Sequence, residues 1–538
     1  SARRAAVATQ LPRLGAGTLT TWTVEGADAW VTCSVPCRID WLGAEMRLLS
    51  ADGADLGAYA VIGFDPVRGL RLAEAAAVSN AAGFRGEYRF DRVEVRNGAG
   101  LATLDRLHTT TLGFVGRVGI SGAIEVDDMQ VPNGVSVGAA PGLQKLTLSV
   151  AGTLTIEEGG AIDVSGQGFG GGDAVGTIGR SPEGIRGSPD GWSGSHGGRG
   201  INIAAVATDR TAGDVYGSIV VPHESGGGGG GHGPIGTLIY DYTGLPGGGV
   251  IDIQATEVVV DGDILARGGT PSAWRDGGAG GSIWIRAQRL SGGGLIDASA
   301  SQPEVCADSL AGGGRVALHV RDFSAFDVAG QVRARGNWNR CQPSHTPVFG
   351  TPGTIYLRDA TSTFGRLRID PGESPTGGGR TPRLETELPA LGGGVLVAAQ
   401  AEGSDSWVAR EGSFPGAWLG SWMALTDAVG ADLGTFEVVA RDTLGRVRLA
   451  GAASVAGSGV TYRGEYRFDS IELLRDAGLS TLDIVRVADM SIEGAARLSG
   501  GFEPQVLTVR AGSSVSPLLG QPRLDLQASQ RLVVEAGA

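Results

Sequence analysis

The chain has 538 residues, 93 of them glycine, with 41% hydrophobic residues and a net charge of −13. The charge is spread along the chain without a basic block, which argues against nucleic acid as a partner, and no apolar run approaches the roughly 20 residues of a membrane helix. The apolar content suffices for a packed core and glycine lacks the every-third spacing of collagen, so neither wholesale disorder nor a collagen-like chain is expected.

A long internal repeat organises the chain. Residues 7–160 recur as residues 384–538, at an offset of 377 positions that becomes 378 after one inserted residue. The longest identical run, Arg-Gly-Glu-Tyr-Arg-Phe-Asp, occurs at 85–91 and returns at 463–469. The chain thus holds about 1.4 copies of one unit, and repetition on this scale indicates an array before it indicates an active site. We therefore expect a segment of a longer tandem array.

The four cysteines are expected to form two disulfides. Cys33 and Cys37 lie four positions apart in the first copy, and both are replaced, by arginine and phenylalanine, in the second. Joint loss is what a bonded pair predicts, because losing one partner would leave a free thiol. Cys306 and Cys341 would form the other bridge, and zinc is the competing interpretation of a lone Cys-x3-Cys. Paired cysteines favour an oxidising, extracytoplasmic setting.

A shorter period inside the unit predicts a parallel β-helix. Short apolar strands, each preceded by glycine two positions earlier, recur at spacings of 32, 33 and 39 residues. Strands this short cannot bury a face alone, whereas parallel stacking gives every backbone group a partner and builds a continuous core. Glycine clusters between them would supply corners that need φ > 0 and close backbone approach. The expected strands are 251–253, 283–285, 316–318 and 355–357, each of the first three followed by 264–266, 296–298 or 332–334, with an earlier pair at 146–148 and 162–164; the glycine clusters are 170–172, 226–231 and 247–249.

The segment at 28–85, repeated at 405–463, has a different pattern. Its expected strands are separated by Asp-Gly and glycine turns, which indicates a small β-barrel or sandwich with Trp30 and Trp41 as core anchors. The all-β chain would then alternate such modules with Gly-rich β-helix. The expected strands of the module are 46–49, 58–62 and 70–72, and the expected domains are a leading segment 1–27, equivalent to 378–404, module A at 28–85, β-helix at 86–385, linker and module B at 386–463, and the start of a second β-helix at 464–538.

The Gly-rich strands resemble those of a known family. Repeats of the form Gly-Gly-x-Ile-x-Ile-x-Ala, with Ser195–Gly198 and Gly226–Gly231 before them, are similar to the Gly-rich β-helix repeats of very large secreted bacterial surface proteins. The resemblance covers roughly residues 90–360. It implies a β-solenoid, a place outside the cell and an adhesive or structural role, and it does not identify a ligand.

Motifs of enzymes are present only as fragments. Gly134–Gly138 matches the nucleophile-elbow pattern, but its residues predict a strand with no helix after it. Gly166–Gly171 matches a dinucleotide fingerprint without the helix that should follow. Aromatic Trp284 and Tyr356 are expected to stack in line with Asp252, so no column of carboxylates for polysaccharide cleavage is predicted. Those aromatic rings would cradle a sugar or pack under a loop, and the chain is not expected to be an enzyme.

Three histidines are the candidate metal ligands. His196, His223 and His232 lie in Gly-rich loops, as does Glu224, and a flexible backbone there could gather them around zinc or copper. The alternative is that each ring bonds only a loop carbonyl or water. No other cofactor is expected except Ca²⁺, through carboxylate oxygens. The aspartate pairs considered for Ca²⁺ are Asp261/Asp263 and Asp127/Asp128, which could equally be solvated turn residues.

These observations predict a structural segment of a giant extracellular repeat protein that forms a stiff surface filament, fibre or stalk. The expected partner is another copy of the repeat, joined end to end through exposed strand edges. The first alternative is an adhesin that binds glycans or another cell surface through its Gly-rich loops. The second is a polysaccharide lyase or hydrolase built on a β-helix.

Overall fold

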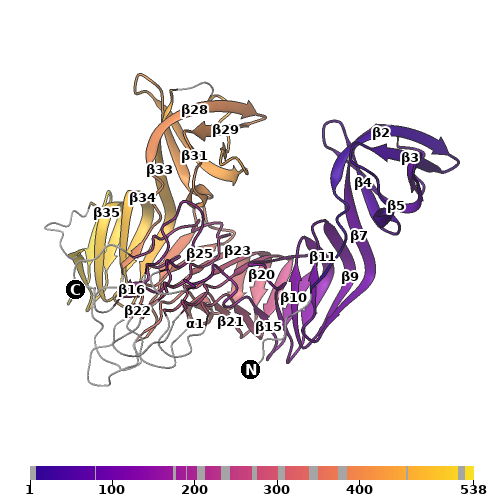
Figure 1. Cartoon of the computed structure of the whole chain (residues 1–538). Coiled ribbons are helices and arrows are strands. Elements are labelled where there is room, and N and C mark those ends of the chain that lie inside the picture. Colours follow the sequence, from indigo (N-terminus) through magenta and orange to yellow (C-terminus); the bar gives the residue numbers. More distant parts are fainter. Residues whose placement is uncertain are drawn as a thin grey trace. The chain divides into compact units, whose positions relative to one another are not determined.

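The chain is almost entirely β-structure (Figure 1). In the part that the structure describes, helix is limited to α1 (Val328–Gln331) and two 3-10 turns, η1 (Ile39–Trp41) and η2 (Gly416–Trp418), which confirms the expected all-β class. No described helix has the length and apolar character to cross a membrane. The structure is a computed structural model that describes residues 8–78, 80–173, 177–189, 191–202, 212–231, 243–269, 276–300, 309–338, 349–373, 385–455, 459–518 and 527–538.

The chain divides into two compact units, and each is described by itself. The first comprises Ser1–Ile162 and Ile253–Gly262, and the second comprises Asp163–Asp252 and Asp263–Ala538. The strands of the first unit are β1 (Ala8–Gln10), β2 (Ala16–Glu25), β3 (Asp28–Cys33), β4 (Glu45–Ser50), β5 (Asp55–Asp65), β6 (Gly69–Leu72), β7 (Ala81–Arg96), β8 (Gly100–Ala102), β9 (Arg106–Val115), β10 (Arg117–Ser121), β11 (Ile124–Val131), β12 (Ser136–Ala139), β13 (Lys145–Val150), β14 (Thr153–Ile156), β15 (Ala161–Asp163) and β18 (Glu257–Val260), while β17 (Val250–Gln254) spans the division.

An antiparallel module opens the first unit. β4 pairs with β5 and β7, and β3 pairs with β2 and β6. Met46, Leu48 and Phe84 are fully or almost fully buried, and Trp41 packs edge-on against Phe84 with ring centroids 5.7 Å apart. The three strands expected within 28–85 lie inside β4, β5 and β6. β2 belongs to the module as well, since it pairs with both β3 and β7.

Parallel ladders follow the module. β7, β9 and β11 pair in parallel, and so do β8, β10, β12 and β15. Alternate side chains of the ladder point inward and form apolar columns, because the register places like residues opposite one another. One column runs Leu112, Met129, Leu154 and Val258, each at most 3% exposed.

The second unit repeats this architecture. β20 pairs in parallel with β23, and β23 with β25, which places Ile283, Val316 and Ile355 in one buried column, as the glycine-anchored period predicts. β19, β21 and β24 form a second parallel ladder. Its further strands are β16 (Ile201–Asn202), β19 (Asp263–Leu265), β20 (Ser282–Ser291), β21 (Leu295–Asp297), β22 (Ser309–Leu310), β23 (Arg315–Ala325), β24 (Val332–Arg333), β25 (Thr354–Arg358), β26 (Arg366–Ile369), β27 (Glu385–Glu387), β28 (Gly393–Glu402), β29 (Asp405–Arg410), β30 (Trp422–Thr426), β31 (Asp432–Arg441), β32 (Val447–Leu449), β33 (Thr461–Leu473), β34 (Gly478–Ile492), β35 (Ala495–Val509), β36 (Ser514–Pro517) and β37 (Arg531–Val534).

The two copies of the sequence repeat pair their strands in the same register. The β2/β3 ladder shifts between Leu19 and Thr21, and the β28/β29 ladder shifts at the equivalent Leu396 and Ala398. The β4/β5 and β30/β31 ladders also share their irregularity, and so do β5/β6 and β31/β32. The ladder strands correspond too, since β7/β9/β11 and β33/β34/β35 pair equivalent residues. The repeat is therefore one of structure as well as of sequence, down to its bulges.

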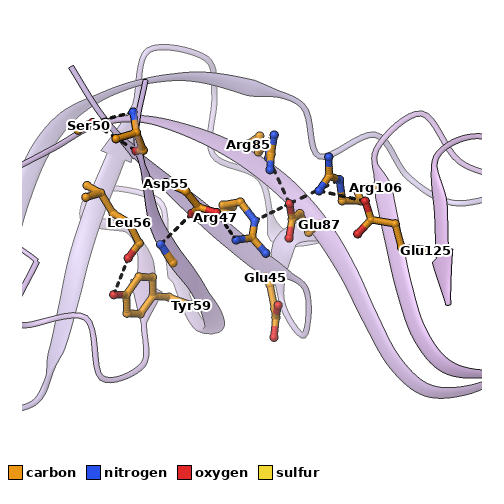
Figure 2. Close-up of polar contacts among 12 residues, drawn as sticks. Glu45, Arg47, Ser50, Asp55, Leu56, Tyr59, Arg85, Glu87, Arg106 and Glu125 are labelled. Carbon is orange, nitrogen blue, oxygen red and sulfur yellow. Dashed lines mark hydrogen bonds and ion pairs between the residues drawn. The ribbon is translucent and has the colours of Figure 1, made fainter. Parts of the chain in front are cut away.

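A buried glutamate from the long identical run lies where the first module meets its ladder. Figure 2 shows Glu87, which is 3% exposed, facing the guanidinium groups of Arg47 at 2.7 Å and Arg85 at 3.2 Å. Arg106, 4.0 Å away, also pairs with Glu125 at 3.0 Å. A buried carboxylate requires such partners, because desolvation alone would disfavour its charge.

The second copy keeps the glutamate and changes the arginines. Glu465, 2% exposed, lies 3.4 Å from Arg463, 3.2 Å from Arg467 and 3.1 Å from Arg486. Of these, only Arg463 corresponds to a partner in the first copy, Arg85. Burial raises the pKa of Glu465, but the hydrogen bonds and charges of Arg486 and Arg467 outweigh it, so the pKa lies below its ordinary value. What the two copies share is a buried carboxylate surrounded by arginine side chains.

The glycine clusters pack backbone against backbone in the second unit. Gly228 N donates to Arg180 O at 3.0 Å, and a Cβ on Gly228 would stand 2.1 Å from Gly170 O. A Cβ on Gly247 would stand 2.0 Å from Gly226 O. None of the described glycines in 170–172, 226–231 and 247–249 has positive φ. The expectation of close approach is confirmed, whereas that of corners with φ > 0 is wrong for these clusters, since segment-to-segment packing is what excludes a side chain here.

Candidate functional site

A charged cleft of about 810 Å³ lies in the second unit. One wall, the Gly-rich wall, comes from residues 182–185, 199, 214–217 and 223–224, another from 387–390, and the third from module B between Arg410 and Arg441. Its volume falls in the range typical of small-molecule sites, ~300–1,000 Å³. The fold brings together walls from positions nearly 200 residues apart in the sequence.

The Gly-rich wall is fixed to module B by a short apolar contact. Val220 is buried in the same core cluster as Trp418, and Ser218 Oγ donates to Leu419 O. Gly420 has φ of +75°, and a Cβ there would stand 2.5 Å from the Val220 side chain. Glycine is needed at 420 for both reasons, so this turn of module B is shaped to receive the segment.

His196 lies behind this wall and is fully buried. Its Nδ1 is 2.8 Å from Gly280 O, and because a carbonyl only accepts, Nδ1 carries the proton. Nε2 is then an acceptor, and it is buried without a hydrogen-bond partner. Burial lowers the pKa of His196 to about 3, with the charge of Arg315 acting in the same direction. The ring is therefore neutral, and it packs on Tyr216 at a centroid distance of 4.9 Å.

Arg315 is a fully buried cation in the same region. Its Nε donates to Tyr216 O and its Nη1 to Thr354 Oγ1, each at 2.9 Å, while Nη2 is buried without a partner. Burial lowers the pKa of Arg315 to about 10. Tyr216 in turn donates its hydroxyl to Ser225 O at 2.8 Å. These groups form a rigid polar layer that supports the cleft wall.

The side chains of His223 and Glu224 contact one another and line the cleft. His223 Nε2 is 3.2 Å from Glu224 Oε1, and Nδ1 is 2.9 Å from Val221 O. The carboxylate is held between two glycines, with positions for a Cβ on Gly416 at 1.8 Å from Oε1 and on Gly217 at 2.9 Å from Oε2.

The expected metal site is not assembled by the described residues. His223 lies beside Glu224, but His196 and His223 each bond a backbone carbonyl, which is the alternative that the sequence left open. Among the residues described, no three histidine, cysteine, aspartate or glutamate side chains are grouped as metal ligands, and this includes the aspartate pairs considered for Ca²⁺. His232 lies outside the described residues.

The remaining predicted sites have structural explanations. Cys33 and Cys37 have their sulfur atoms 2.10 Å apart, as a disulfide requires, whereas Cys306 and Cys341 lie outside the described residues. Ser136, in the nucleophile-elbow match, begins strand β12.

The aromatic column is packed against other parts of the second unit. Tyr356 is 1% exposed and donates its hydroxyl to Phe364 O at 2.8 Å. Trp284 is covered by the guanidinium of Arg286, 3.9 Å from its ring, and Arg286 also pairs with Asp252 at 2.6 Å. Of the two alternatives, packing rather than an open sugar platform is what the structure has.

Sequence reasoning missed the arginines of the module wall. Arg410 Nε donates to Ser413 O at 2.9 Å, and Arg441 Nε donates to Phe414 O at 2.6 Å. One signal could have found them. Arg410 and Phe414 replace the disulfide of the first copy, and Arg441 replaces Phe64, so the module differs between copies where it lines the cleft.

Comparison of the chain with protein-family models, curated proteins and solved structures found no match.

Proposed function

We propose that the chain is a structural segment of an extracellular repeat protein, in which each unit of 377–378 residues combines an antiparallel module with a Gly-rich parallel β-helix. The observation that carries the proposal is the shared register of the two copies, including their bulges. A unit that adopts the same fold twice within one chain is suited to repetition, because each copy specifies its own strand pairing.

The parallel ladders supply the mechanical property. In each ladder every strand bonds its backbone to the next, and apolar columns such as Ile283, Val316 and Ile355 run through successive strands. Such stacking makes stability nearly one-dimensional, since each strand depends mainly on its neighbours. Stiffness along the stack is the expected consequence, and this suits a filament or stalk.

The Cys33–Cys37 disulfide supports a place outside the reducing cytosol. Immunogold labelling of intact producing cells with antibodies against this chain tests the location. We expect label on the outer surface without permeabilisation. Label that appears only after permeabilisation would contradict an extracellular role.

Negative-stain microscopy of the purified chain over a concentration series tests the architecture. We expect stiff rods that join end to end into regular filaments as concentration rises. Compact, unassociated particles at every concentration would contradict the structural role. Isolated rods that never join would favour the second candidate, an adhesive segment, for which the charged cleft is the specific supporting observation.

A further inference from the structure

The module wall of the cleft differs from the other two walls in how its charges are balanced. On the other two walls, Arg199 lies 2.5 Å from Glu387 and 3.8 Å from Asp214, so these two carboxylates are already compensated, and Glu183 and Glu224 also line the cleft. On the module side, Arg410 and Arg441 donate to backbone carbonyls. Within the described chain neither has an acidic partner at ion-pair distance. The module wall therefore presents two guanidinium groups to the cleft that form no ion pair with the described residues.

Both arginines are oriented by one turn. Their Nε atoms donate to the adjacent carbonyls of Ser413 and Phe414, which brings the two guanidinium groups to the same part of the module wall. Arg410 Nη1 donates a long hydrogen bond of 3.4 Å to Tyr462 Oη, and its guanidinium lies 5.4 Å from the centre of the Phe414 ring. Arg441 has no further described contact. A planar guanidinium fixed through Nε keeps its terminal N–H groups for a carboxylate, which it can hold through two parallel hydrogen bonds.

The fold of the module does not require this pair. The first copy has Cys33 and Phe64 at the positions of Arg410 and Arg441, and it keeps the same β-register. The copies diverge at the positions that line the cleft. In the first copy a disulfide already holds this turn. The arginines of the second copy therefore add a property that the disulfide lacks, namely positive charge directed into the cleft.

We infer that this cleft binds a carboxylate-bearing saccharide of the uronate class, with Arg410 and Arg441 holding its carboxylate. The other two walls suit the rest of such a ligand. Asp214 and Glu387 are acceptors that can take hydrogen bonds from sugar hydroxyls. The chain carries a net charge of −13, which would repel a long polyanion, so the site is matched to a single uronate residue or a short oligomer.

Calorimetric titration of the full chain with digalacturonate tests the inference. The comparison ligands are its dimethyl ester and the neutral galactobiose. We expect digalacturonate to bind and both uncharged ligands to bind at least about tenfold more weakly, because they lose the charge-assisted pairs. The Arg410→Gln/Arg441→Gln variant, whose amides can still donate to the turn carbonyls, should lose about tenfold or more in affinity for digalacturonate.

A matched variant removes the same charge elsewhere. Arg13→Gln/Arg531→Gln changes two exposed arginines that do not line the cleft, and it should bind digalacturonate as the wild type does. Equal losses in both double variants would assign the effect to net charge and overturn the inference. Absence of digalacturonate binding by the wild type, or equal binding of galactobiose, would also overturn it.

Two further measurements exclude trivial outcomes. If thermal melting shows that the double variant is unfolded, the single exposed change Arg441→Gln is used with the same expected direction. N-acetyl-dialanine, a carboxylate without sugar hydroxyls, should bind at least about tenfold more weakly than digalacturonate; equal binding would contradict the saccharide class. These results are independent of whether the chain forms filaments, so this inference and the structural proposal can fail separately.

Discussion

The carboxylate of Glu224 lies against the backbone of Gly416, so closely that a Cβ at Gly416 would stand 1.8 Å from Oε1. At the equivalent position the first copy has Ile39, which is 61% exposed. The contact therefore belongs to the second module alone. It joins the Gly-rich wall of the cleft to the module wall at a point where a side chain at 416 would displace the Glu224 carboxylate.

Gly416→Ala should displace the Glu224 carboxylate from its contact with His223 and destabilise the second unit by about 1–3 kcal/mol, the usual cost of overpacking. Chemical denaturation monitored by tryptophan fluorescence measures this. Ile39→Ala, the matched change in the first copy, should alter stability by less than about 0.5 kcal/mol. In a Glu224→Ala background the Gly416→Ala effect should largely vanish, and simple additivity would contradict the contact.

The parallel ladders could be predicted because their signal is local. Ile283, Val316 and Ile355 each follow glycine by two positions and recur at spacings of 33 and 39 residues, so the sequence alone indicates which residues stack. The structural reason for the glycines between the strands could not be predicted. A positive φ and a close backbone approach both exclude a side chain, and the sequence pattern is the same for each.

The cleft could not be predicted from the sequence, for a different reason. His223 and Glu224 are adjacent and were singled out, but the buried state of His196 depends on segments near Gly280 and Arg315. Arg410 belongs to a module far along the chain. Only the mismatch between the two copies pointed to it, because a position that differs between otherwise equivalent modules is free of the demands of their common fold.

Gly228→Ala should strongly destabilise the second unit, because the new Cβ would stand 2.1 Å from Gly170 O in a backbone that has no flexible side chain to yield. We expect a loss of at least about 2 kcal/mol, measured by urea denaturation. Gly293→Ala is the control, since nothing lies within 4 Å of its Cβ position and its φ is not positive. That change should be neutral or stabilising by up to about 1 kcal/mol. Similar effects of both changes would contradict the packing role of the cluster.

The second unit should lose stability as pH falls below about 6.5, the ordinary pKa of histidine in an unfolded chain. Burial lowers the pKa of His196 to about 3 and that of His319 to about 4. Between pH 6.5 and these lower values the unfolded chain therefore binds protons that the folded rings do not bind. The stability present above pH 6.5 is lost as pH falls toward the folded-state pKa values, by about 2 kcal/mol per ring at pH 5. Thermal melting across this pH range measures the loss.

His196→Asn tests which group is responsible. Asparagine can keep a donor to Gly280 O but does not titrate, so the fall in melting temperature between pH 7 and pH 5 should be smaller than in the wild type. His108→Asn is the control, because this side chain is 26% exposed and lies on a strand of the first unit. An unchanged pH profile in His196→Asn would show that another group governs the acid response.

Substitution of either of two equivalent aspartates should affect only the copy of the repeat in which it lies. Asp105 accepts hydrogen bonds from the backbone N–H groups of Leu14 and the residue after it, at 2.6 and 2.8 Å. Asp483 does the same for Leu391 and its successor, at 2.7 and 2.8 Å. Replacing either by alanine leaves two N–H groups without their acceptor, at about 1–3 kcal/mol for each that stays buried. Hydrogen exchange should therefore accelerate around Leu14 in Asp105→Ala and around Leu391 in Asp483→Ala. Acceleration in both copies from one substitution would contradict units that each specify their own fold, since sites without shared partners should act additively.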